Sequence, residues 1–504
     1  MSRITVDIDL NRVEGDLELQ VDVEEGVIVD ARCIGTLYRG FEQILIGRAP
    51  RDALVITPRV CGICGTAHLY AAVRALEQLA GINPPRHAGH IRNLCLMAET
   101  LQSDLRQTFL FFTPDFCHPS YAGHPMADVI ARAFAPFKGR VARGALEASR
   151  NVLKLVAIFG GQWPHSSYMV PGGVTLPATG NRLLEAKDVL ARVRAWMEQD
   201  VIGDDLDTWL AVPSGPELFT WLESVPAHRD GGLGLFSRFA RSIGLHTLGR
   251  GSPHLLSFGL SPTPNGSRAL APGFFNGDTC RVEPLDQPRI NEHVSHSWFL
   301  DYPGGRHPWQ GETIPDHKPD ARHYSWAKAP RYSDKVVQTG PLAELRVGAE
   351  PLITNLLSAE GDNTWLRQFA RLRRATWVLR SMQETLSALG GCLDEPHFVD
   401  PKVGKWPDGQ SYGLVEAARG ALGHWVRIED GRIAKYQIVT PTAWNASPRD
   451  SQDQPGHWEQ SLIGLRIPDI DDPVQVGHIV RSHDPCLVCT VHFIGQARKT
   501  YACV

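Results

Sequence analysis

The segment that determines the fold of this chain is Arg59-Val-Cys61-Gly-Ile-Cys64-Gly-Thr-Ala-His68. A second segment of the same type lies near the other terminus, Asp484-Pro-Cys486-Leu-Val-Cys489-Thr-Val-His492. Each contains two cysteines in Cys-x-x-Cys spacing, followed by a histidine. Two thiolates at this spacing can chelate one soft or borderline metal ion. We therefore expect the fold to bring both ends of the chain together around a metal.

The cysteine spacing by itself leaves three kinds of metal site open. Four thiolates can hold a structural zinc ion, an iron–sulfur cluster or another redox metal. Zinc ribbons contain the same pair of pairs, but only about 15–20 residues separate them. Here almost the whole chain lies between Cys64 and Cys486. This separation is a poor match to a small zinc module.

The composition is that of a globular protein with a sizeable core. Of the 504 residues, 43% are hydrophobic and 21% are charged. The net charge of −4, without a basic tract, argues against a nucleic-acid-binding protein. No apolar run approaches the roughly 18–20 residues that cross a bilayer, and the N-terminus lacks the apolar segment of a secretory signal. We therefore expect a cytoplasmic protein that has no membrane span and reaches a membrane only through partners.

The hydrophobic pattern predicts an α+β fold. Residues 4–35 alternate apolar and polar side chains, as β-strands do. A loop and a β-hairpin are expected over residues 412–440, with the hairpin turn at Glu429-Asp-Gly431. Residues 212–345 are rich in Gly, Pro and aromatic residues and are expected to form a loop-rich decoration. Helical periodicity predicts a central bundle of long helices over residues 69–79, 87–113, 126–159, 182–199 and 363–391.

Six motifs in order along the chain resemble the large, catalytic subunit of [NiFe] hydrogenases. Two are the cysteine motifs, and the others are Arg12-Val-Glu14-Gly, Arg39-Gly-Phe-Glu42, Glu416-Ala-Ala-Arg419-Gly-Ala-Leu-Gly-His-Trp425 and Pro441-Thr-Ala-Trp-Asn445. The resemblance covers nearly the whole chain. It implies the large-subunit fold, in which the long-helix bundle is central and β-structure lies peripherally at the N- and C-terminal ends.

A single domain over residues 1–504 is therefore expected. Its parts are an N-terminal β region (1–60), the first metal motif with helices (61–200), the loop-rich insertion (212–345), a helix, hairpin and second metal motif (363–492), and a C-terminal extension (493–504). In catalytic relatives, a maturation protease removes an extension of this kind.

The resemblance implies a nickel ion held by Cys61, Cys64, Cys486 and Cys489, next to an iron ion with CO and cyanide ligands. Cys64 and Cys489 would bridge the two metals, and Thr442 would donate a hydrogen bond to a cyanide. The implied reaction is heterolytic cleavage of H₂ into protons and electrons. The electrons would leave through a small subunit carrying iron–sulfur clusters, because the other cysteines form no second constellation.

Five further residues take roles in the reaction by the same resemblance. Arg419 would lie over the metals, with Asp484 and Asp104 as its carboxylate partners. Glu14 would pass protons from a thiolate toward the surface, because a carboxyl group in a partly apolar site has a raised pKa suited to a relay. His68 would donate a hydrogen bond to a bridging thiolate.

A second metal ion is also implied. Glu42, His492 and the backbone carbonyl of Ile438 resemble the ligands of a Mg²⁺ (or Fe²⁺) ion that fixes the C-terminus in the core. Oxygen and imidazole ligands suit such an ion.

The sequence is compatible with two roles, H₂ uptake and H₂ sensing. Ala418 and Asp16 depart from the commonest family pattern and favour the cytoplasmic uptake and H₂-sensing branches. Ile63 and Phe111 occupy positions at which sensing relatives narrow the gas channel with bulky side chains. The alternative is that both are ordinary core residues. The C-terminal extension favours uptake. We therefore expect an uptake hydrogenase, with a regulatory H₂ sensor that signals to a histidine kinase as the alternative.

Overall fold

The computed structural model describes residues 3–9, 12–13, 17–260, 269–318, 320, 322–402, 404–470 and 472–486. Three predicted site residues, Glu14, Cys489 and His492, lie outside the described residues, as does the predicted extension 493–504.

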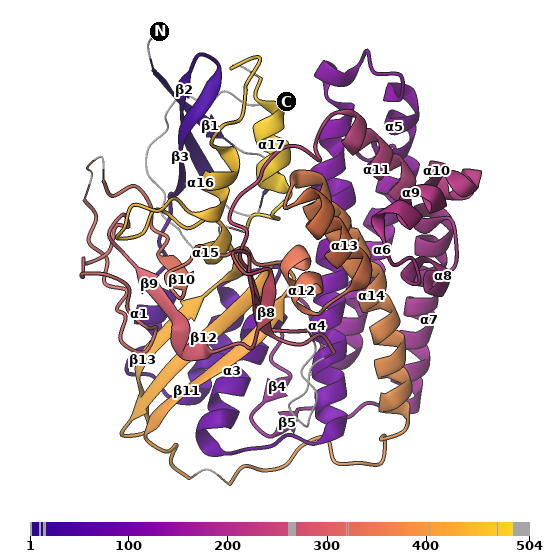
Figure 1. Cartoon of the computed structure of the whole chain (residues 1–504). Coiled ribbons are helices and arrows are strands. Elements are labelled where there is room, and N and C mark those ends of the chain that lie inside the picture. Colours follow the sequence, from indigo (N-terminus) through magenta and orange to yellow (C-terminus); the bar gives the residue numbers. More distant parts are fainter. Residues whose placement is uncertain are drawn as a thin grey trace.

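Long helices form the body of the molecule (Figure 1). The longest, α14 (Thr364–Gly390), packs against α4 (Arg86–Arg106), which also packs against α6 (Arg140–Gly160). α6 in turn packs against α7 (Gly180–Trp196). Side-chain caps fix the start of two of these helices, since Asn363 accepts from the Leu366 N–H and Thr179 from the Arg182 N–H. The predicted central bundle is confirmed.

The region predicted as one helical stretch, 126–159, consists of two helices. α5 (Ala127–Phe134) ends before Pro136, and α6 begins at Arg140. Ala135 has an extended backbone (ψ 132°) because the ring of a following proline disfavours the helical conformation.

Two of the three-stranded antiparallel sheets lie on the same side of the helix bundle (Figure 1). The N-terminal sheet contains β1 (Ile4–Asp9), β2 (Leu17–Glu24) and β3 (Val27–Gly35). The other contains β11 (Gly409–Ala417), β12 (Gly420–Glu429) and β13 (Arg432–Val439), which include the predicted hairpin. α3 (Gly65–Ala80) packs against β11 and β12. Gly413 permits this contact, because a Cβ atom there would lie 1.9 Å from the Ala71 carbonyl oxygen.

The first part of the insertion 212–345 is helical, whereas the sequence predicted a loop-rich segment throughout. Residues 215–242 form three helices, α9 (Gly215–Ser224), α10 (Pro226–Asp230) and α11 (Gly232–Ser242). The hydroxyl of Ser214 caps α9, and the buried Phe236 and Phe239 anchor α11 in the core. The many glycines and prolines here begin helices rather than interrupt them. The rest of the insertion holds the short strands β6 (Leu255–Ser257), β7 (Gly273–Asn276), β8 (Arg281–Glu283), β9 (Ile290–His293) and β10 (Ala329–Tyr332), and α12 (Pro341–Val347) begins near its end.

The two ends of the chain meet in one apolar cluster. Leu19 and Ile28 of the N-terminal sheet pack with Trp458 of α16 (His457–Leu462) and Ile479 of α17 (Val474–Arg481). Two backbone hydrogen bonds join Ile28 to residues 464 and 465. The remaining named helices and strands are short: α1 (Phe41–Leu45), α2 (Ala53–Ile56), β4 (Met169–Val170), β5 (Gly173–Val174), α8 (Leu206–Leu210), α13 (Pro351–Glu360) and α15 (Pro441–Asn445).

The helices of the chain differ from membrane-spanning helices. Within the described ranges, none combines the length and the apolar character that crossing a bilayer requires.

A buried ion pair between α3 and α4 gives a stability prediction. The Arg92 guanidinium donates to both carboxylate oxygens of Glu77 (3.1 and 2.8 Å) and to the carbonyls of Val170 and Gly173 (both 2.7 Å). Arg92→Ala leaves Glu77 buried and unpaired, which costs about 3–5 kcal/mol. We expect the urea-unfolding midpoint of the full chain to fall accordingly.

The control is Arg86→Ala, which removes an exposed pair with Glu395. Such pairs contribute under about 1 kcal/mol. Equal midpoints for the two variants would contradict a structural role for the Arg92 pair.

Candidate metal centre

Three cysteines from the two ends of the chain converge in the interior. The sulfur atoms of Cys61, Cys64 and Cys486 all lie within 4.8 Å of one another, and the Cys61 and Cys486 sulfurs are 3.3 Å apart. All three are buried, packed with Ile63 and with Trp163. Sulfur ligands at about 2.3 Å from one ion would be spaced similarly. The donor set therefore fits a thiolate-bound metal.

A buried carboxylate fixes the segment that carries Cys64. Cys64 precedes the first turn of α3, and the N–H groups of Thr66 and Ala67 in that turn donate to Glu99 of α4 (3.0 and 3.2 Å). Burial raises the pKa of Glu99 to about 7. The position of Cys64 at a helix N-terminus favours its thiolate form. Sequence reasoning missed Glu99, although a glutamate within a long, otherwise apolar helix stretch is a usable signal.

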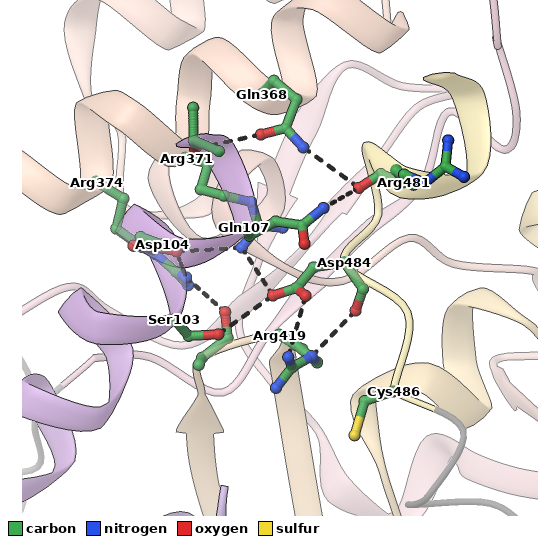
Figure 2. Close-up of polar contacts among 12 residues, drawn as sticks. Ser103, Asp104, Gln107, Gln368, Arg371, Arg374, Arg419, Arg481, Asp484 and Cys486 are labelled. Carbon is green, nitrogen blue, oxygen red and sulfur yellow. Dashed lines mark hydrogen bonds and ion pairs between the residues drawn. The ribbon is translucent and has the colours of Figure 1, made fainter. Parts of the chain in front are cut away.

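Arg419 lies beside the cysteines, at the turn between β11 and β12. Its Nη2 is 3.1 Å from Asp484 Oδ1, and its Nε donates to the Asp484 backbone carbonyl (3.1 Å) (Figure 2). Its Nη1 has no hydrogen-bond partner among the described residues. Burial acts to lower the pKa of Arg419, but the charges of Asp484 and the three cysteines raise it well above its usual value. The guanidinium is therefore a fixed positive charge next to the sulfur cluster.

The predicted contact between Asp104 and Arg419 is replaced by a longer connection. Asp104 accepts two hydrogen bonds from Arg374 (3.0 and 2.6 Å). Arg371 donates to both Asp104 (3.1 Å) and Asp484 (3.3 Å), so that it links the two carboxylates (Figure 2). Asp104 is thus linked to Arg419 through Arg371 and Asp484, and Arg374 also donates to the carbonyl of Ala418, the residue before Arg419. Sequence reasoning missed both arginines, whose signal is the unusual Arg-Leu-Arg-Arg sequence at 371–374 in a buried helix.

His68 and Thr442 both lie in the buried region around the cysteines. The Thr442 hydroxyl accepts from the Cys486 N–H (3.2 Å) and so holds the second cysteine motif in place. His68 Nδ1 is 3.0 Å from His424 Nε2, and His68 Nε2 has no partner among the described residues. Burial lowers the pKa of His68 to about 4, so the ring is neutral at neutral pH.

A small cavity adjoins the predicted second metal site. Its volume is about 80 Å³, and its lining includes Glu42, Glu292, Lys328 and Ile438. Glu42 Oε1 accepts from the Ile438 N–H (2.9 Å). Lys328 Nζ lies 2.8 Å from Glu292 and 3.6 Å from Glu42. Glu292 Oε1 is buried without a partner in the described part of the chain. The carboxylate groups of Glu42 and Glu292 are thus brought together, and the lining offers the oxygen ligands that a divalent cation prefers.

The two residues that pointed to a sensing role occupy different surroundings. Ile63 is buried among the cysteines. Phe111 is half-buried, and the Arg106 guanidinium lies over its ring at 5.1 Å from the ring centroid.

Comparisons with known proteins agree with this site. The nickel-dependent hydrogenase family matches residues 39–124 and 243–492. The chain is 34% identical to the periplasmic [NiFeSe] hydrogenase large subunit of Desulfomicrobium baculatum, over 98% of this chain and 95% of that protein. It is 31% identical to the uptake hydrogenase large subunit of Rhodobacter capsulatus, over 97% and 95% respectively. The reduced Ni-Fe-Se hydrogenase of D. vulgaris Hildenborough superposes with a TM-score of 0.81 at 31% identity, covering 97% of this chain and 100% of that one.

These relatives correct one expectation and establish the family. The cytoplasmic location expected from the sequence is contradicted by the periplasmic relative, and we withdraw it. On the family match, the identities and the shared fold, this chain belongs to the nickel-dependent hydrogenases and is the large subunit of a [NiFe] hydrogenase, an oxidoreductase that acts on H₂.

Proposed function

We propose that Cys61, Cys64, Cys486 and Cys489 hold a nickel–iron centre at which this chain oxidises H₂ in an uptake role. The observation that carries the proposal is the convergence of the three described cysteines, from opposite ends of the chain, beneath a buried arginine. When bound, a nickel–iron centre with CO and cyanide ligands supplies the redox chemistry of heterolytic H₂ cleavage. The printed sequence has cysteine at all four motif positions, so every proposed ligand is a sulfur atom.

The side chains around the cysteines would prepare the site for this reaction. The guanidinium of Arg419, whose Nη1 has no partner among the described residues, offers a fixed positive charge beside the sulfur atoms, and Asp484 holds it in place. Such preorganised charge in a buried site costs no reorganisation when the reaction occurs. In the proposal Glu14 accepts the released proton and passes it outward, and the hydroxyl of Thr442 supports a cyanide ligand.

Electrons would leave through a small subunit that carries iron–sulfur clusters. Within the described ranges, the cysteine cluster is the only group of three or more His, Cys, Asp or Glu side chains gathered closely enough to hold a metal. The described part of the chain therefore offers no chain of metal sites leading away from the centre. The relatives are themselves named as large subunits, which supports a partner of this kind.

The uptake role is favoured over H₂ sensing by the similarity to an uptake hydrogenase. The regulatory alternative gains no specific support from the relatives. Sustained H₂ oxidation with an artificial electron acceptor would favour the catalyst, whereas H₂ binding with negligible turnover would favour the sensor.

An infrared spectrum tests the nickel–iron centre. We expect the protein, purified with its natural partner, to show bands in the CO and cyanide stretching region that shift when H₂ is added. Cys64→Ser should lose these bands together with its nickel, because in the proposal this thiolate is a ligand of both metals. Cys95→Ser is the control, since Cys95 is equally buried but lies outside the cluster. A wild-type spectrum without bands, in protein fully loaded with metal, would contradict the proposal.

We also propose that Glu42, the Ile438 carbonyl and His492 bind a Mg²⁺ (or Fe²⁺) ion beside the 80 Å³ cavity. Glu292 Oε1 supports this: it is buried and has no partner in the part of the chain that the structure describes, and a nearby cation or its bound water would satisfy it. Glu42→Gln should lower the content of this ion by about one per chain, measured by elemental analysis. Glu283→Gln, which changes a partly exposed glutamate on β8, should leave it unchanged. Equal ion content in both variants would rule out Glu42 as a ligand.

A further inference from the structure

Three buried side chains form a line that ends at the cysteine cluster. Tyr436 Oη is 2.9 Å from His424 Nδ1, and His424 Nε2 is 3.0 Å from His68 Nδ1. All three residues are at most 1% exposed. They come from three neighbouring elements, β13, β12 and α3, which lie together in the lower part of Figure 1.

The sheet register explains why these residues meet. His424 of β12 is paired with Ile438 of β13, and Tyr436 is paired with Val426. His424 and Tyr436 are therefore diagonal neighbours on one face of the hairpin, within reach of long side chains. α3 packs against β12, which brings His68 to the other side of the His424 ring.

Burial keeps all three groups neutral near pH 7. It lowers the pKa of His68 to about 4 and the pKa of His424 well below its usual value, where the neighbouring His68 lowers it further. It also raises the pKa of Tyr436 well above its usual value. A neutral imidazole has one N–H donor and one acceptor nitrogen, so each ring must adopt one of two tautomers.

The two directions of hydrogen bonding differ in which donor they leave without a partner among the described residues: the N–H of His68 Nε2, where the Cys61 charge acts, or the Tyr436 hydroxyl. If the Tyr436 hydroxyl donates to His424 Nδ1, then His424 Nε2–H donates to His68 Nδ1, and the remaining proton of His68 is on Nε2. In the opposite direction, the Tyr436 hydroxyl proton has no acceptor among the described residues. His68 would then present a bare Nε2 lone pair to the negative field of the thiolates, and Cys61 contributes charge at this ring. An unsatisfied buried donor costs about 1–3 kcal/mol.

We propose that Tyr436 and His424 are positioning residues that keep the proton of His68 on Nε2, so that His68 donates a hydrogen bond to a thiolate of the metal centre. This inference rests on the proposed function, because it concerns the thiolate ligands of that centre. A hydrogen bond withdraws electron density from a thiolate and so changes the electron density of the metals it binds. Loss of an outer partner of this kind typically costs 10–100-fold in metal affinity or activity.

The test is the infrared spectrum of a set of variants purified with the natural partner. In Tyr436→Phe, His424 no longer has a fixed tautomer, and in His424→Phe the link to His68 is removed. We expect the CO and cyanide bands of both variants to move to lower frequency, because the thiolate becomes more electron-rich. His424→Gln should return the bands toward the wild-type positions, because its amide N–H can still donate to His68.

The matched control is Tyr332→Phe. Tyr332 is fully buried, and its hydroxyl accepts from the Asp286 N–H (2.8 Å) in another cluster. This variant should show wild-type bands. It therefore separates the effect of breaking the Tyr436–His424–His68 line from the effect of losing any buried hydroxyl. Unchanged bands in Tyr436→Phe and His424→Phe, at full nickel content, would overturn the inference. A wild-type protein without bands would instead overturn the proposed function.

Discussion

Thiolates from the two ends of the chain must reach one buried point, and much of this fold serves that requirement. Cys61 and Cys64 enter through the turn before α3, and Cys486 enters after α17. The N-terminal sheet and the C-terminal helices share one apolar cluster, which supports the approach of the second motif to the first. Glu99 and Thr442 then hold the backbone next to Cys64 and at Cys486. The apolar packing thus brings the cysteines near each other, and the hydrogen bonds set their positions.

The charges of the site are held by a network that extends into the helix bundle. Arg419 and Asp484 form the part next to the cysteines, and Arg371 joins them to Asp104. Arg374 continues the network from Asp104 to Glu344 (2.7 Å). Buried ion pairs contribute little net stability because desolvation offsets their attraction. Their value here is geometric, since each charged group is held by at least one neighbour in a fixed position.

Sequence reasoning recovered the parts of this protein that depend on local pattern. The cysteine motifs, the long helices and the hairpin carry signals within short windows. The partners of Asp104 were missed because they depend on how α4 and α14 pack, which no local pattern records. Glu99 was missed for the same reason, since it caps a helix other than its own. The helices over residues 215–242 were missed because glycine and proline were read as breaks, whereas here they start helices.

The central claim is that the fold closes both ends of the chain around nickel through sulfur ligands. X-ray absorption at the nickel edge tests this most directly, because it counts the atoms bound to the metal and identifies their type. The account predicts a nickel ion in the purified complex with four sulfur neighbours. A spectrum with mainly nitrogen and oxygen neighbours, or a protein that holds zinc in place of nickel, would contradict it.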